Sequence, residues 1–147
     1  MAFPPGAEVF ELRREVQAED LDTQAHVNNV VYVRWVQDVA VGHWEARTTH
    51  ETRTEVGWAL LRHEIDYHKA ALLGDHVALR TAVGHLEGLT FERWVEIRRV
   101  EDDTLLARSR TLWCPIDMRT GRPRRLSKEL RAVFSHISGQ PEGATAE

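Results

Sequence analysis

The amino-acid sequence predicts an α+β domain in which one antiparallel sheet wraps around a long helix. Apolar residues recur at helical spacing over one long segment, 28–47. Four strand-like stretches follow it, and the short connections between them favour antiparallel neighbours. The 147 residues suit a single domain, which we place at 8–137, between an irregular lead-in at 1–7 and a flexible tail at 138–147.

The first third of the domain is expected to form a strand, a loop and the long helix. Residues 8–17 suggest the strand, and the polar residues 18–27 suggest the loop. Asn28 or Asn29 is suited to cap the helix, because a short polar side chain accepts a hydrogen bond from the free amides of its first turn. A helix that is apolar over so much of its circumference is expected to be buried. Its apolar residues are Val30, Val33, Val36, Ala40 and Trp44, with Val31, Trp35 and Val39 widening the stripe.

The rest of the domain is expected to complete the sheet and end in a helix. Residues 48–56 are polar and favour either a loop or a short surface helix. Residues 127–137 suggest the closing helix, with Ser127 as its cap, after a turn at 120–123. Turn residues separate four expected strands, at 57–69, 75–87, 90–100 and 104–117.

Composition excludes several classes of function. The 19 basic and 23 acidic side chains leave a net charge of −4, which argues against a general nucleic-acid-binding protein. Cys114 is the single cysteine, so the chain can form neither an internal disulfide nor a cysteine zinc cluster. No apolar run is long enough to span a bilayer, and the N-terminus lacks the features of a signal peptide. We therefore expect a cytoplasmic protein.

The most informative segment is 20–32, which reads Asp-Leu-Asp-Thr-Gln-Ala-His-Val-Asn-Asn-Val-Val-Tyr. One interpretation is local capping, since Asp and Asn are common in loops and at helix starts. The other is catalysis. A helix start presents free N–H groups that stabilise a developing oxyanion, and Asp22 beside it would act as general base or nucleophile. His26 would orient a group or shuttle a proton.

This segment resembles a known family. The pattern Asp-x-Asp-x-x-x-His-Val-Asn-Asn-x-x-Tyr is similar to that of the hotdog-fold thioesterases of the 4-hydroxybenzoyl-CoA thioesterase and acyl-CoA thioester hydrolase group. The His-Val-Asn-Asn run is also similar to that of plant acyl-ACP thioesterases. The resemblance continues in Glu-Ile-Asp-Tyr at 64–67, Leu-Gly-Asp at 73–75 and Arg-Thr-Gly-Arg-Pro at 119–123. It covers about residues 8–137.

The resemblance implies a hotdog fold, in which the sheet curls around the helix, and a homodimer or homotetramer with active sites between subunits. It assigns Asp22 as the catalytic carboxylate. It also implies that the helix-start amides near Asn28 and Asn29 polarise the thioester carbonyl. His26 would position the loop or a water molecule. Some family members have a Gly at the position of Ala25. Others place a catalytic Glu on the helix, where Gln37 and Asp38 are weak matches, so the chain fits the His-Val-Asn-Asn branch.

Other candidate sites are weaker. His63 and His68 are an odd number of residues apart, so they point to opposite faces of a regular strand and do not suggest a metal site. Glu64 shares its face with Arg62, which favours a salt bridge over catalysis. Cys114 follows a tryptophan in a strand, which favours packing over a nucleophilic role. The sequence contains no Gly-x-Ser-x-Gly elbow and no dinucleotide-binding or Walker A loop. We expect no metal and no cofactor.

A basic segment lies at 119–131 and holds six basic residues. It is either a solvated surface or a clamp for phosphates, for which arginine is suited by its paired donors. An acyl-CoA substrate needs such a clamp, and we name Arg122, Arg124 and Arg125 as the candidates.

The function expected from these observations is hydrolysis of an acyl-CoA to a carboxylic acid and free CoA, with CoA as part of the substrate. The acyl chain is expected along the helix, against Tyr32, Val33 and Val36 or their equivalents in the partner subunit. Two alternatives stay open. One is a thioesterase acting on an acyl-ACP or releasing a polyketide, and the other is a non-catalytic acyl-binding protein on the same fold.

Overall fold

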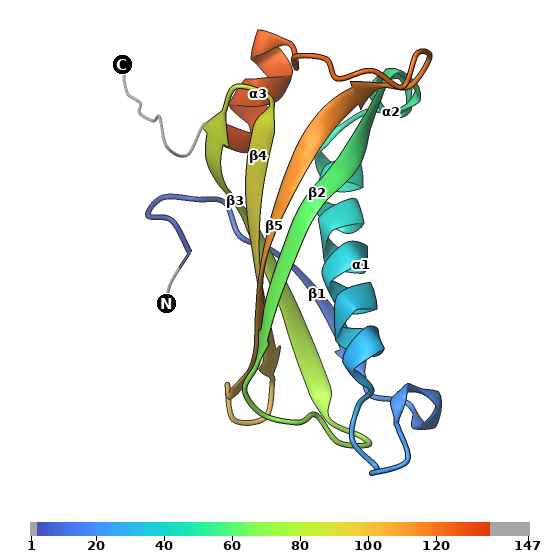
Figure 1. Cartoon of the computed structure of the whole chain (residues 1–147). Helices are drawn as coiled ribbons and strands as arrows, with labels where there is room; N and C mark the ends of the chain where they lie inside the picture. Colours follow the sequence, from blue (N-terminus) through green and yellow to red (C-terminus); the bar gives the residue numbers. More distant parts are fainter. Residues whose placement is uncertain (1–2, 136–147) are drawn as a thin grey trace.

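The structure is a computed structural model that describes residues 3–135. It contains a five-stranded, fully antiparallel sheet with strand order β1-β3-β4-β5-β2 and a long helix along one face (Figure 1). The predicted α+β class is therefore confirmed. The short connection between the expected strands 57–69 and 75–87 predicts that they are neighbours, and this prediction is wrong. Two other strands lie between β2 and β3, because residues 68–75 cross the end of the sheet. The expected tail at 138–147 and the last two residues of the expected closing helix lie outside the described residues. The elements are β1 (Phe10–Glu15), the short 3₁₀ helix η1 (Ala18–Asp20), α1 (Asn29–Arg47), α2 (His50–Glu55), β2 (Val56–Tyr67), β3 (His76–Glu87), β4 (Thr90–Arg99), β5 (Leu105–Asp117) and α3 (Lys128–Ser135).

Helix boundaries follow the predicted caps. The Asn28 side chain accepts a hydrogen bond from the Val30 N–H, which makes Asn28 the N-cap of α1. The Ser127 hydroxyl accepts from the Leu130 N–H at the start of α3, as predicted. The polar stretch after α1 forms α2, one of the two options expected there. The predicted loop at 18–27 also contains η1.

Helix α1 buries one face against the sheet. Two valines of the predicted stripe do not belong to that face: Val30 is 64% exposed and Val33 is 38% exposed. Valines occur all around this helix, so spacing alone did not separate the buried face from the others. The buried residues of α1 are Val31, Tyr32, Trp35, Val36, Val39, Ala40 and His43.

Strand β2 is an edge of the sheet and runs beside α1. At one end the Tyr67 hydroxyl donates to the Asn29 carbonyl at 3.2 Å, and at the other the Trp44 and Trp58 rings meet edge to face at 5.5 Å. A bulge near Leu61 interrupts the pairing of β2 with β5. Leu60 and Leu61 are 49% and 56% exposed. The side of the molecule formed by α1 and β2 therefore shows apolar surface and an unpaired backbone edge.

Candidate functional site

Residues 21–28, here called the Asp22 loop, lead from η1 into α1. One carboxylate oxygen of Asp22, Oδ1, accepts hydrogen bonds from the N–H groups of Gln24 at 2.8 Å and His26 at 3.2 Å. Ala25 adopts a left-handed conformation with φ of 62°, which closes the turn. The second oxygen, Oδ2, has no partner among residues 3–135. Asp22 thus shapes the loop with one oxygen and leaves the other available to a ligand.

The start of α1 follows this loop directly. The Asn28 carbonyl and side chain accept from the N–H groups of Val31 and Val30, and the Asn28 N–H donates to the Asp20 carbonyl. The Asn29 N–H has no partner within the described chain. It is an exposed donor at the positive end of a 19-residue helix, which suits an oxygen that gains negative charge. The His26 side chain is exposed in the same loop.

The residues expected to contact the acyl chain lie in different surroundings. Tyr32 is buried, its hydroxyl accepts from the Ala71 N–H at 2.9 Å, and burial raises its pKa. Val36 is buried in the core, and Val33 is exposed on the outer side of the helix. None of the three lines the cavity described next.

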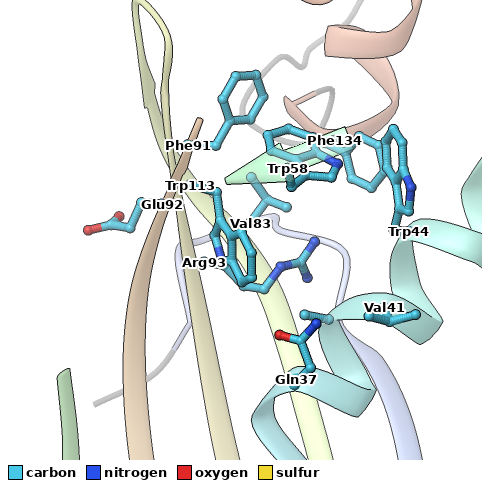
Figure 2. A pocket seen from close by; sticks show the side chains of 11 residues that line it. Gln37, Val41, Trp44, Trp58, Val83, Phe91, Glu92, Arg93, Trp113 and Phe134 are labelled. Carbon is cyan, nitrogen blue, oxygen red and sulfur yellow. The ribbon is translucent and has the colours of Figure 1, made fainter. Parts of the chain in front are cut away.

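A cavity of about 130 Å³ lies between the C-terminal half of α1 and the sheet (Figure 2). Five aromatic rings dominate its walls, so we call it the aromatic cavity. Local sequence patterns did not predict it, because its walls come from six separate elements whose meeting depends on the packing of the whole fold. Its lining residues are Gln37, Ala40, Val41, Trp44, Trp58, Val83, Phe91, Glu92, Arg93, Trp113 and Phe134.

A polar network borders the aromatic cavity. Arg93 Nη1 lies 3.0 Å from His43 Nδ1, and His43 Nε2 lies 2.9 Å from Glu8 Oε1. A guanidinium has no acceptor, so Nδ1 accepts from Arg93 and Nε2 donates to Glu8. The imidazole is then neutral, and burial together with the charge of Arg93 lowers the pKa of His43 to about 4. Hydrogen bonding to Arg47 is the main cause that lowers the pKa of Glu8 to about 2.

The basic segment lies at the end of the molecule opposite the Asp22 loop, next to α3 (Figure 1). Arg122 and Arg125 are exposed, and Arg124 is half-buried. None of the three forms an ion pair within the part of the chain that the structure describes. Along α1 the rise of about 1.5 Å per residue separates Asn29 from Trp44 by roughly 22 Å. One chain therefore does not bring Asp22 together with the aromatic cavity or the basic segment.

The weaker candidates have structural roles. Glu64 pairs with Arg62 at 2.8 Å and with Arg110 at 3.5 Å, as its position predicted. Cys114 is buried. His63 Nε2 lies 3.0 Å from Ser109 Oγ. Residues 3–135 contain no cluster of His, Cys, Asp and Glu side chains suited to a metal ion and no helix long and apolar enough to cross a membrane.

Comparison with known proteins decides the family. The family model described as "Thioesterase-like superfamily" matches residues 16–134, which include the Asp22 loop, the whole of α1 and β2 to β5. The chain belongs to this superfamily. No curated protein sequence matches the chain significantly.

Solved structures agree with the hotdog fold of this superfamily at low sequence identity. A thioesterase from Thermus thermophilus, solved with coenzyme A and Zn, is 23% identical, with a TM-score of 0.77 over 92% of this chain and 98% of that one. A hypothetical protein from Staphylococcus aureus, solved with CoA, is 16% identical, with a TM-score of 0.82 over 96% and 91%. The 1,4-dihydroxy-2-naphthoyl-CoA thioesterase from Synechocystis is 17% identical, with a TM-score of 0.77 over 90% and 100%. At these identities the likeness establishes the fold.

The depressed pKa of His43 gives stability a defined pH dependence. The unfolded chain binds a proton at this histidine below its ordinary pKa of 6.5, whereas the folded chain does so only near pH 4. Stability from this group is therefore complete above pH 6.5 and is lost as the pH falls towards 4. We expect a loss of about 2 kcal/mol between about pH 7.5 and about pH 5.

Urea unfolding at the two pH values measures this loss. His43→Gln should show a smaller decrease than the wild type, because it carries no titrating imidazole. His50→Gln, at an exposed position of α2, is the control and should keep the full decrease. Equal pH dependence in wild type and His43→Gln would contradict the assignment.

Proposed function

We propose that the protein is an acyl-CoA thioesterase, with Asp22 as its catalytic carboxylate. The observation that carries this proposal is the arrangement of the Asp22 loop. One oxygen of Asp22 is fixed by two backbone N–H groups, the other is free, and the same loop ends at the free N–H of Asn29. A fixed carboxylate can activate water, and a preorganised amide donor can stabilise the oxyanion that forms when a thioester is hydrolysed.

The proposed reaction uses these groups in two steps. Asp22 removes a proton from water as the water oxygen attacks the thioester carbonyl carbon, and the Asn29 N–H stabilises the negative oxygen that forms. The tetrahedral intermediate then expels the CoA thiolate, which takes the proton from Asp22 to become the thiol and restores the carboxylate. Direct attack by Asp22, giving an anhydride that water cleaves, requires the same placement of the two groups. In this proposal the exposed carboxamide of Asn29 and the exposed imidazole of His26 orient the thioester or the water.

We propose that two chains complete each site. A two-fold axis normal to the sheet would pair the free β2 edges of two copies in antiparallel fashion. The α1 helices of the two copies would then also run antiparallel, so the start of one helix lies beside the C-terminal half of the other. This arrangement brings Asp22 of the partner subunit towards the aromatic cavity and the basic segment, which one chain keeps apart.

CoA fits the basic segment. Its three phosphate groups carry the negative charge that exposed arginines bind through paired N–H donors. Two similar structures, from Staphylococcus aureus and Thermus thermophilus, were solved with CoA. An acyl-carrier thioester presents a phosphopantetheine arm on an acidic protein, and comparing its hydrolysis with that of the CoA thioester distinguishes the two carriers.

Replacing Asp22 tests its catalytic role. Asp22→Asn keeps an oxygen that can accept from the Gln24 and His26 amides, so the loop should survive, but it cannot accept a proton from water. We expect kcat for acyl-CoA hydrolysis to fall by roughly 10²–10⁴-fold. Asp20→Asn, the same change two residues earlier, is the control and should retain most of the activity. Near-normal turnover by Asp22→Asn would falsify its assignment.

Light scattering tests the shared site. We expect a dimer of about 34 kDa or a larger assembly, from the chain mass of 16.9 kDa. Leu60→Glu with Leu61→Glu places charges on the β2 edge and should yield an inactive monomer. Leu73→Glu, at a 60% exposed position in the β2–β3 loop, should leave the assembly intact. A wild-type monomer with full activity would rule out a site that needs two chains.

Replacing Arg124 and Arg125 by alanine tests the phosphate clamp. This double substitution should raise KM for an acyl-CoA more than it lowers kcat. Added salt should reduce the difference in KM between wild type and variant. An N-acetylcysteamine thioester of the same acid lacks the phosphates, so its KM should hardly change. The control is the double change Arg13→Ala with Arg14→Ala, in another adjacent pair of exposed arginines. An equal effect on both thioesters would assign the arginines to folding or assembly instead.

A further inference from the structure

The aromatic cavity contains one charged side chain directed into it. Figure 2 shows the guanidinium of Arg93 projecting into the space beside Gln37, whereas the carboxylate of Glu92 points away on the other side of the sheet. Glu92 is engaged there by Arg110 at 2.5 Å and by the His85 N–H at 3.0 Å. The cation on the cavity wall is therefore not neutralised by its neighbour in sequence.

The donors of Arg93 are only partly used. Both hydrogens of Nη1 are accounted for, by His43 Nδ1 at 3.0 Å and by Thr81 Oγ1 at 2.9 Å. The Thr81 hydroxyl itself donates to the Trp94 carbonyl at 2.9 Å, so its oxygen is free to accept. Nε and Nη2 have no hydrogen-bond partner within residues 3–135. Arg108 also has two nitrogens without a hydrogen-bond partner, but those are fully buried, whereas Nε and Nη2 of Arg93 keep accessible surface.

The free donors form a carboxylate-binding edge. Nε–H and one N–H of Nη2 lie side by side on the planar guanidinium, and this edge accepts both oxygens of a carboxylate at once. No carboxylate of the described residues lies within ion-pair distance of Arg93, since Glu8 reaches it only through the neutral His43. Burial lowers the pKa of Arg93 to about 10, which leaves it charged at neutral pH. Gln37 on the facing helix offers a further amide donor.

The walls define the rest of the ligand. A volume of about 130 Å³ is close to that of engineered protein cavities that hold one benzene molecule. Trp44, Trp58, Phe91, Trp113 and Phe134 supply ring faces and edges that favour a planar aromatic group. The space therefore suits a single ring rather than a long, flexible chain.

We propose that Arg93 determines specificity for a ring-sized acyl group that carries a carboxylate at the end distant from the thioester. The ring lies among the aromatic walls of the cavity, and its carboxylate binds the Nε–Nη2 edge of Arg93. The thioester then points out of the cavity towards Asp22 of the partner subunit. The effect of Arg93 on catalysis rests on the proposed thioesterase function. Its effect on binding rests on the aromatic cavity and on the Arg93 nitrogens that have no partner.

The test compares two thioesters that differ only in the group at the para position of the ring. In wild-type protein, kcat/KM for 4-carboxybenzoyl-CoA should exceed that for 4-methylbenzoyl-CoA by about 10- to 100-fold, the range expected for hydrogen bonds to a charged group. Arg93→Met should abolish this preference, and Arg93→Lys should restore only part of it, because an ammonium keeps the charge but lacks the paired donors. Arg13→Met, at an exposed arginine of β1, is the charge-matched control and should keep the preference.

Binding measured without turnover separates this inference from the proposed function. Three tryptophans line the cavity, so their fluorescence reports a ligand there. Monomethyl terephthalate should quench it at lower concentration than methyl 4-methylbenzoate, with the difference lost in Arg93→Met. Such binding without hydrolysis of any thioester would support the site and reject the enzyme. Hydrolysis of both thioesters at equal rates by wild-type protein, or equal binding of the two esters, would overturn the role of Arg93 even if the variants failed to fold.

Discussion

The packing of α1 against the sheet is the interaction on which the other features depend. Seven buried side chains of this helix meet the sheet, and each large apolar one contributes about 1.5–3 kcal/mol on burial. The same packing fixes both ends of the helix. The start carries the Asp22 loop, and the C-terminal half supplies one wall of the aromatic cavity. Because the helix is straight and 19 residues long, these two regions are held apart within one chain.

Much of this architecture could be predicted from local sequence patterns. The caps at Asn28 and Ser127, the pairing of β3 with β4 and of β4 with β5, and the acidic, amide-rich loop before α1 are all determined by residues close in sequence. The position of β2 beside β5 is not, because the chain between β2 and β3 crosses two other strands. The identity of the buried face of α1 was not predictable in full. Val30 and Val33 have the same character as Val31 and Val36, and only the position of the sheet decides which of them are covered.

The aromatic cavity and its charge were beyond local patterns for a related reason. Alternation along β4 places Arg93 on the same face as Val95 and Ile97, but it does not show which groups lie opposite that face. The partner of Arg93, His43, is 50 residues away, and Glu8 is 35 residues before that histidine. Such contacts follow from the pairing of β3 with β4 and from the approach of α1 to both strands. By contrast, Asp22 could be singled out because its turn and its free oxygen belong to the same few residues.

The network around His43 leaves an uneven balance of charge at the cavity. The carboxylate of Glu8 is paired with Arg47, and the neutral imidazole of His43 separates it from Arg93. The folded chain therefore holds one positive charge in excess within a region of low polarity, which is unfavourable in the absence of an anion. An anion that neutralises it binds only the folded state, and so makes folding more favourable by an amount that grows with the logarithm of its concentration. Occupancy of the cavity by a carboxylate and stability of the fold are therefore two measures of the same free energy.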